Sequence, residues 1–335
     1  MTPSTLDLFL LAAGAFGLGL IMLIKSGGLI VDAATSIARR FHVPPLIIGF
    51  TVVAFGTSLP ELVVSVNAAS KGTGGIALGN VIGSNIANIL FVLAVSALVA
   101  PLIIQDRRSV LRDSVMMGVV TLLLVGMMAA GGITMAGGLI MILFLTAYII
   151  WQIATSQKAR TATQEALLEE VTQHPIKYER FAAALPALLA GLLGVTLGAE
   201  LLIRGTIVGA GILGVPESVI ALSAIAIGTS LPELATCIPA ARKGHASILI
   251  GNILGSNVFN ILLILGVTAM VLPLTSDMGE ERLMSIDLPI MAGAAFGLIG
   301  LLLFRAGVGR VAGLLMLGGY AAYIGHMALT ANVTL

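Results

Sequence analysis

The chain has 335 residues, of which 58% are hydrophobic and only 10% charged, with a formal net charge of +1 and a mean hydropathy of +1.09. This composition excludes a soluble globular domain, which at this length would need far more polar surface, and it predicts an all-α integral membrane protein. A net charge near zero gives no support to a nucleic-acid partner, and a single cysteine, Cys237, excludes an internal disulfide.

Apolar stretches that can cross the roughly 30 Å hydrocarbon core as helices recur along the sequence. No cleavable signal pattern precedes the first of them, so we expect that stretch to be retained. The first and sixth stretches are long, so we expect these two helices to be tilted and able to slide against the others. We predict ten transmembrane helices, near residues 7–37, 46–70, 76–102, 108–129, 132–153, 183–213, 217–241, 246–274, 284–304 and 308–331.

Two pairs of opposite charges fall inside the long stretches. Glu200 and Arg204 are four residues apart in the sixth stretch, and Lys25 and Asp32 are seven residues apart in the first. We expect each pair to neutralise its charges as a structural contact, with a gating contact as the alternative.

An internal repeat occupies the middle of each half of the sequence. A shift of 172 residues aligns 51–102 with 223–274 without a gap, and roughly half of the aligned positions are identical. Two motifs recur in it: GTSLPEL at 56–62 and 228–234, and GNVIGSNIANIL at 79–90, which becomes GNILGSNVFNIL at 251–262.

The repeat divides the chain into two five-helix units. The segment between them has no EF-hand spacing, so we expect a solvated connector and not a Ca²⁺ sensor. Tyr148 and Trp151, just before this segment, fit an interfacial anchor. The predicted units are 1–153, with core motifs at 46–102, a cytoplasmic linker at 154–182, and 183–335, with core motifs at 218–274.

Lys and Arg are distributed unevenly over the predicted loops. If the N-terminus is outside, the outward loops hold only Lys71 and Arg282, and the inward loops hold the remaining loop Lys and Arg residues, so we predict that both termini are outside. Under the 172-residue shift, the outward Lys71 corresponds to the inward Lys243. Corresponding loops therefore lie on opposite sides, which predicts inverted repeats, an architecture of many secondary transporters.

The GTSLPEL motif predicts a broken helix. Pro60 would remove a backbone hydrogen bond from a continuous helix, as would Pro232 in the second copy, and lipid offers no replacement partner. We expect Thr57 and Ser58 to cap a second half-helix, with Pro60 near its first position and Glu61 in its first turn. This arrangement would gather carbonyls, hydroxyls and one carboxylate around the break.

The second motif supplies further oxygen atoms. Ser84 and Asn88 are four residues apart on one helical face, and Ser256 and Asn260 repeat the arrangement. Carboxylate, hydroxyl and amide oxygens are hard ligands of the kind that Na⁺ and Ca²⁺ prefer, and no cluster of His and Cys points to a softer metal. The two halves could thus supply matching parts of one site at the bilayer midplane.

These paired motifs resemble the two α-repeats of the sodium/calcium exchanger family, within the calcium/cation antiporter superfamily. The resemblance covers about a third of the chain. It implies a Ca²⁺/Na⁺ antiporter that works by alternating access, with Glu61 and Glu233 binding Ca²⁺ or Na⁺ in turn. By the same resemblance, the cation sites would be completed by side chains of Thr57, Ser58, Ser84, Asn88, Thr229, Ser230, Ser256 and Asn260 and by backbone carbonyls near Ala54 and Ala226.

One position departs from part of that family. Some relatives, including potassium-dependent exchangers, carry Asp where this chain has Asn260, and here both Asn88 and Asn260 are amides. The departure argues against K⁺ co-transport. It also leaves two central carboxylates, whose formal charge matches one Ca²⁺.

Other functions remain open at this point. A carboxylate removed from water can bind a proton in place of a metal ion, so a Ca²⁺/H⁺ antiporter is the alternative, followed by a cation channel. Each glutamate could instead be an internal ion-pair partner, and the GSN segments could serve close packing only. An intramembrane enzyme is not expected, because the sequence lacks HExxH, paired aspartates and a Ser/His dyad in the membrane. We expect no cofactor, only transported Ca²⁺ and Na⁺, and a plasma-membrane or bacterial inner-membrane location.

Overall fold

The computed structural model describes residues 5–41, 43–158, 177–213, 228–278, 281–305 and 307–331. This part of the chain is helical apart from short turns and four two-residue strands. It contains eight helices long and apolar enough to cross a membrane, or nine if a bent pair over Pro45–Ser70 counts as one span. The predicted span at 217–241 lies partly outside the described residues, so the count of ten stays a prediction.

Six long helices surround the centre of the molecule. They are α1 (Thr5–Phe41), α7 (Arg107–Ala129), α8 (Met135–Lys158), α10 (Phe181–Ile212), α15 (Leu288–Phe304) and α16 (Arg310–Ala331). A π-helical turn, η5 (Leu283–Asp287), precedes α15, and a 3₁₀ turn, η4 (Ser276–Met278), lies before it. Asp106 caps α7 by accepting a hydrogen bond from the Ser109 amide at 3.0 Å.

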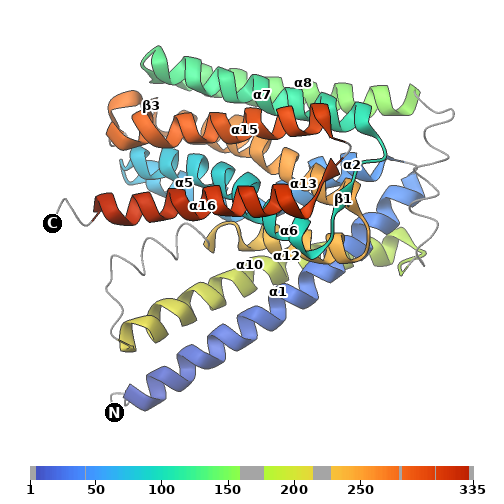
Figure 1. Cartoon of the computed structure of the whole chain (residues 1–335), viewed down its shortest axis with the longest axis horizontal. Coiled ribbons are helices and arrows are strands. Elements are labelled where there is room, and N and C mark those ends of the chain that lie inside the picture. The colour runs from blue at the N-terminus through green and yellow to red at the C-terminus, as the bar shows by residue number, and fades with distance from the viewer. Residues whose placement is uncertain are drawn as a thin grey trace.

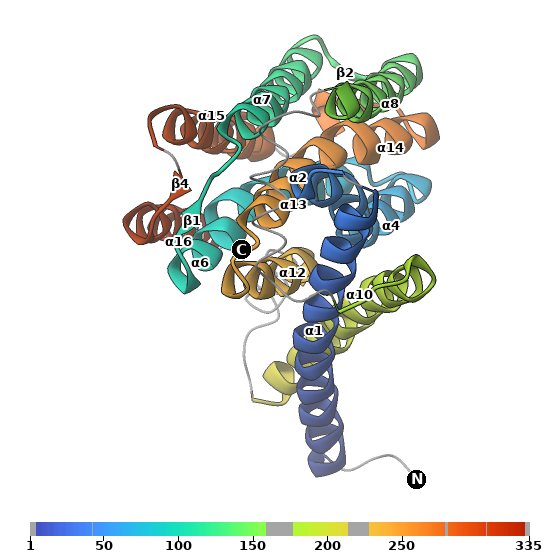
Figure 2. The ribbon, with the colours of Figure 1, turned by 90° about the vertical axis from the view of Figure 1, so that its right-hand side faces the viewer.

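Helices α1 and α10 pack against each other along most of their length and lie beside the remaining helices (Figure 2). Glycines allow this close approach: a Cβ atom at Gly19 would lie 2.6 Å from the carbonyl oxygen of Gly198, and one at Gly205 would lie 2.6 Å from that of Ala12. Small residues are typical of helix contacts in membranes, where close backbone packing replaces the hydrophobic effect. As predicted, α1 and α10 are the longest helices, with 37 and 32 residues.

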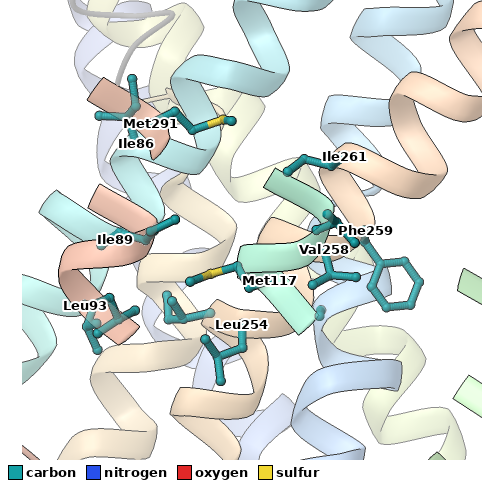
Figure 3. Close-up of a cluster of buried hydrophobic side chains, with 14 of the residues drawn as sticks. Ile86, Ile89, Leu93, Met117, Leu254, Val258, Phe259, Ile261 and Met291 are labelled. Atoms are coloured by element: carbon teal, nitrogen blue, oxygen red, sulfur yellow. The ribbon is translucent and has the colours of Figure 1, made fainter. Parts of the chain in front are cut away.

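Two composite helices form the centre. The first consists of α5 (Gly74–Ala87), the π-helical η2 (Asn88–Leu93) and α6 (Ala94–Val99). The second consists of α13 (Ala246–Phe259), the π-helical η3 (Asn260–Leu265) and α14 (Gly266–Val271). The segments have the same lengths in the same order, as the 172-residue repeat requires. Every residue of α13 is buried, and Figure 3 shows Leu254 and Val258 of this helix beside Met117 of α7.

Four short strands join the two halves of the chain. Strand β1 (Leu102–Ile103) pairs antiparallel with β4 (Gly307–Val308), and β2 (Gly132–Ile133) pairs antiparallel with β3 (Leu274–Thr275). Strands β1 and β3 are equivalent under the repeat, and each pairs with a strand of the other half. In Figure 1, β3 lies at the same end of the molecule as the start of α1 and the end of α16, and β1 lies at the opposite end.

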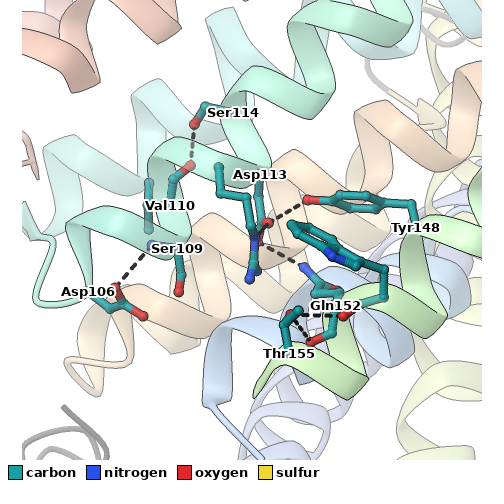
Figure 4. A network of polar contacts seen from close by, with 10 residues as sticks. Asp106, Ser109, Val110, Asp113, Ser114, Tyr148, Gln152 and Thr155 are labelled. Atoms are coloured by element: carbon teal, nitrogen blue, oxygen red, sulfur yellow. Dashed lines mark hydrogen bonds and ion pairs between the residues drawn. The ribbon is translucent and has the colours of Figure 1, made fainter. Parts of the chain in front are cut away.

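A buried carboxylate ties α7 to α8 (Figure 4). Asp113 accepts hydrogen bonds from Tyr148 at 2.6 Å, from Gln152 at 3.0 Å and from Arg112 at 2.7 Å. The Arg112 guanidinium also lies over the Trp151 ring, 5.7 Å from its centroid. Trp151 is half exposed, as an interfacial anchor would be, but Tyr148 is buried. The prediction for Tyr148 was wrong, because Asp113 offers its hydroxyl an internal partner.

The two predicted charge pairs have different outcomes. Glu200 and Arg204 form the expected ion pair, with 2.5 Å between Oε1 and Nε, at the surface of α10. Asp32 does not pair with Lys25; it pairs with Lys243, at the end of α12 (Leu231–Arg242), and with Lys177 at 3.1 Å. The second prediction was wrong because a residue 211 positions away in sequence reaches Asp32 across the packed helices α1 and α12.

Candidate cation site

Helix breaks position the first part of the site. A helical segment made of α2 (Pro45–Ile48), the π-helical η1 (Gly49–Val53) and α3 (Ala54–Thr57) ends before Ser58, and α4 (Leu59–Ser70) continues after it at an angle of 44°. Ser58 has φ −86° and ψ 3°, and Ser230, before α12, has φ −88° and ψ 2°. Ser230 therefore repeats the backbone conformation of Ser58, and Pro60 and Pro232 each lie in the first turn of the helix that follows.

The hydroxyls at the breaks do not cap these helices. Ser58 and Ser230 stand at the N-cap positions, but neither side chain makes a capping hydrogen bond, and both hydroxyl oxygens are buried with no partner among the described residues. Thr57 Oγ1 lies 3.3 Å from the carbonyl oxygen of Ala54 and 3.3 Å from Asn252 Oδ1. The prediction of side-chain caps was wrong, and its consequence is that two hydroxyl oxygens stay free for another partner.

Two glutamates occupy the first turns after the breaks. Glu61 and Glu233 are both fully buried, and within the described ranges neither takes part in an ion pair. Neither oxygen of the Glu61 carboxylate has a hydrogen-bond partner there; Glu233 Oε1 accepts from Ser256 Oγ at 3.3 Å, and Oε2 has none. Buried charges of this kind are costly unless a cation or a proton compensates them.

Hydroxyls connect the halves of the chain around the glutamates. Thr57 Oγ1 and Ser256 Oγ are 3.5 Å apart, and Ser84 Oγ and Thr229 Oγ1 are 3.2 Å apart. These two contacts are equivalent under the 172-residue repeat. Each break therefore faces the central helix of the other half, and the site is built from both.

The two predicted asparagines begin the π-helical segments. Asn88 and Asn260 are fully buried, and π turns of this kind often mark functional sites. Segment η3 packs against α4, which carries Glu61, and η2 packs against α12, which carries Glu233. Within the described part, neither amide atom of Asn88 has a partner, and Asn260 Oδ1 has none.

The two backbone carbonyls implied by the resemblance have different outcomes. The Ala54 carbonyl accepts from the Ser58 amide at 3.0 Å and lies near Thr57 Oγ1, so it is placed at the break. Ala226 lies outside the described residues, and its placement stays a prediction.

Sequence reasoning missed a supporting layer of asparagines. Asn80 Nδ2 donates to the Glu61 carbonyl at 3.2 Å and to Ser65 Oγ at 3.0 Å. Asn252, its equivalent, donates to Thr236 Oγ1 at 3.0 Å and faces Thr57 with its oxygen. The signal was available, since the Gly-Asn pairs that open both copies of the second motif recur 172 residues apart.

The cluster combines two carboxylates with neutral hydroxyl, amide and carbonyl oxygens. Within the residues that the structure describes, no group of three or more His, Cys, Asp or Glu side chains is arranged to hold a metal ion. A site with few charges and many neutral oxygens suits hard cations that must also be released.

Comparisons with known proteins agree over most of the chain. A sequence model described as sodium/calcium exchanger protein matches residues 11–154 and 183–329. The inner membrane protein YrbG of Escherichia coli is 32% identical over 318 residues, which cover 94% of this chain and 96% of that protein. The sodium/calcium exchanger MaX1 of Methanosarcina acetivorans is 30% identical over an alignment of 339 positions, which covers 92% of this chain and 95% of that protein. The solved structure of the sodium/calcium exchanger from Methanococcus jannaschii is similar with a TM-score of 0.78 at 29% identity, over 95% of this chain and 98% of that one.

Proposed function

This chain belongs to the sodium/calcium exchanger family of integral membrane antiporters, and we propose that it exchanges Ca²⁺ for Na⁺ across the membrane by alternating access. The observation that carries the proposal is the pair of fully buried glutamates, Glu61 and Glu233, which have no ion-pair partner within the described ranges. Their combined formal charge is neutralised by one Ca²⁺ or by two Na⁺.

The proposed cation site combines oxygens from both halves. Glu61 and Glu233 bind Ca²⁺ or Na⁺ in turn, and the neighbouring hydroxyls, amides and carbonyls replace water around the ion. The unpartnered oxygens among the described residues support this assignment. The remaining proposed ligands are Thr57, Ser58, Ser84, Asn88, Thr229, Ser230, Ser256 and Asn260, with carbonyls of Ala54 and Ala226.

We also propose that the halves 1–153 and 183–335 are inverted five-helix repeats joined by a cytoplasmic linker at 154–182. The reciprocal strand pairs support inversion: β1 and β3 are equivalent, yet β3 lies at the end of the molecule opposite β1 (Figure 1). Basic residues of the chain would then gather at the cytoplasmic end, with both termini outside.

The moving part of the mechanism is the pair α1 and α10. Glycines on both helices bring the two backbones into close contact, and α1 also touches the site-bearing helix α12. The two carboxylates of an ion-free site would repel each other, whereas a bound cation would remove the charge and let α1 and α10 slide past the site.

Uptake of ⁴⁵Ca²⁺ into proteoliposomes tests the exchange. Vesicles loaded with Na⁺, K⁺ or acid are compared at a clamped membrane potential, and we expect uptake only when internal Na⁺ is present. Uptake driven by a proton gradient alone would favour the Ca²⁺/H⁺ alternative, and uptake without any counter-ion gradient would favour a channel.

Glutamine substitutions test the site. Glu61→Gln and Glu233→Gln should each abolish Ca²⁺ flux, because each removes half of the compensating charge. Glu200→Gln is the matched control, since Glu200 is exposed and its one ion pair among the described residues is with Arg204. Normal flux in either buried variant would contradict the site assignment.

A further inference from the structure

Two hydrogen bonds connect the central helices beside the proposed site. Asn85 of α5 donates from Nδ2 to the backbone carbonyl of Asn257 on α13 at 3.2 Å. Asn85 Oδ1 accepts from Nδ2 of Asn260 at 3.0 Å. All three residues are buried, and Asn260 Oδ1 has no partner among the described residues.

The chemistry of the groups determines which one donates and which one accepts in each of these hydrogen bonds. A backbone carbonyl can only accept a hydrogen bond, so Asn85 must turn its NH₂ group toward Asn257. The thioether of Met291, 3.8 Å from the same nitrogen, is also an acceptor; Figure 3 shows Met291 beside Ile86, which follows Asn85 in the chain. The Asn85 oxygen must therefore face Asn260, and Asn260 must turn its NH₂ group toward Asn85. The oxygen of Asn260 is left on the other side of its amide.

The surroundings of that oxygen belong to the proposed cation site. Asn260 opens η3, which packs against the glutamate-bearing helix α4. Ser256, one turn earlier on the same face, donates to Glu233. An amide in the opposite orientation would present two hydrogens with partial positive charge toward the cation.

We propose that Asn85 is a positioning residue that holds the amide of Asn260 with its oxygen toward the transported cation. The inference rests on the proposed function. Asn85 itself does not touch the ion; it acts through Asn260, as hydrogen-bond partners behind metal ligands commonly do. The Asn257 carbonyl orients the Asn85 amide, which in turn orients the Asn260 amide. Residues from both halves of the chain therefore set this orientation together.

The equivalent hydrogen bond to Asn88 is not formed in the other half. Asn257, the equivalent of Asn85 under the repeat, donates its Nδ2 to the carbonyl of Ile253 on its own helix at 2.8 Å. It therefore does not fix Asn88, the equivalent of Asn260. Asn257 is a matched control, because it is equally buried and loses the same amide on substitution but positions no proposed ligand.

The test measures KM for Na⁺ and for Ca²⁺, together with kcat, for full-length protein in proteoliposomes. Asn260→Ala first identifies the cation whose KM depends on this residue. Asn85→Ala should raise the KM for that same cation about tenfold, with a smaller change in kcat, because the loss of a partner behind a ligand typically weakens binding by that order. Asn257→Ala should leave the KM within about twofold of the wild-type value.

A carboxylate at position 260 separates positioning from a general structural role. Asp presents an oxygen in either orientation, so adding Asn85→Ala to Asn260→Asp should change the KM by less than about twofold. An equal effect of Asn85→Ala in both backgrounds, or an equal effect of Asn257→Ala, would overturn the proposal.

A milder variant covers the case in which Asn85→Ala does not fold. Asn85→Ser keeps a hydroxyl that can donate to Asn257 and accept from Asn260, and it should give a smaller KM increase that also disappears with Asn260→Asp. A KM unchanged in Asn85→Ser and unchanged in the double variant would count against positioning. A wild-type protein that moves no Ca²⁺ would overturn the proposed function instead.

Discussion

The buried carboxylates of Glu61 and Glu233 set the balance between stability and transport. Without a bound cation their charges are desolvated and unpaired among the described residues, so the ion-free protein carries an energetic strain that a cation relieves. The same residues that make transport possible therefore weaken the empty state.

This balance predicts an effect on thermal stability. Glu61→Gln should raise the melting temperature of the ion-free protein in detergent, because it removes an unpaired buried charge. Ca²⁺ at about a hundred times its Kd should stabilise the wild-type protein by about 2.7 kcal/mol and the variant by much less. Thermal unfolding with and without Ca²⁺ measures both effects, with Glu200→Gln as the control. A variant that is less stable without ions and equally stabilised by Ca²⁺ would refute this account.

The sequence predicted which residues form the site better than it predicted which residues those side chains contact. The repeated Pro-Glu pairs were enough to predict that Glu61 follows a helix break and that Glu233 lies in the first turn of a helix. The partners of Asp32 and of Asn260 could not be predicted, because Lys243 and Asn85 are 211 and 175 positions away in the chain. Only the packing of the helices brings them together.

At the scale of elements, the sliding pair α1 and α10 depends on glycines at particular places. Gly19 has no room for a side chain against the Gly198 carbonyl, whereas a Cβ atom at Gly14, on the same helix, would meet nothing within 4 Å. The two glycines lie on the same helix, but only Gly19 lies against the backbone of α10.

Gly19→Ala should therefore separate α1 from α10. We expect a loss of about 1–3 kcal/mol in the free energy of unfolding, typical of overpacking, together with slower Na⁺-driven Ca²⁺ uptake. Gly14→Ala should be neutral or slightly stabilising, since Ala favours helix over Gly. Uptake and thermal unfolding of both variants check this, and equal behaviour of the two would show that the Gly19 contact is unimportant.

Most long helices could be predicted from hydropathy, and the breaks from proline. The π-helical turns η2 and η3 could not, because one extra residue in a turn leaves the apolar pattern almost unchanged. The absence of side-chain caps could not be predicted either. Ser58 and Ser230 occupy the expected N-cap positions, but neither hydroxyl makes a capping hydrogen bond. A local sequence pattern does not reveal the direction of a hydroxyl that lies against the other half of the molecule.

At the scale of the whole molecule, inversion predicts opposite accessibility of equivalent positions. Ser70 and Arg242 are 172 residues apart, and both are exposed at the ends of α4 and α12. The native Cys237 is buried and should stay unreactive, so single cysteines can be introduced directly.

A membrane-impermeant thiol reagent applied to intact cells should label Ser70→Cys from outside. Arg242→Cys should react only after the membrane is opened, because we expect its loop to face the cytoplasm. Labelling of both variants from the same side would rule out inverted repeats. Labelling in the reverse order would keep the inversion and reverse the orientation in the membrane.

The strand pairs β1–β4 and β2–β3 have a consequence for ancestry. Each equivalent strand finds its partner in the other half, so neither half could close its own strand pair alone. An ancestral protein of half the length would have met this need by associating with a second copy inserted in the opposite direction. Gene duplication and fusion would then have joined the two copies, after which each copy was free to diverge, as the unequal bonding of Asn85 and Asn257 illustrates.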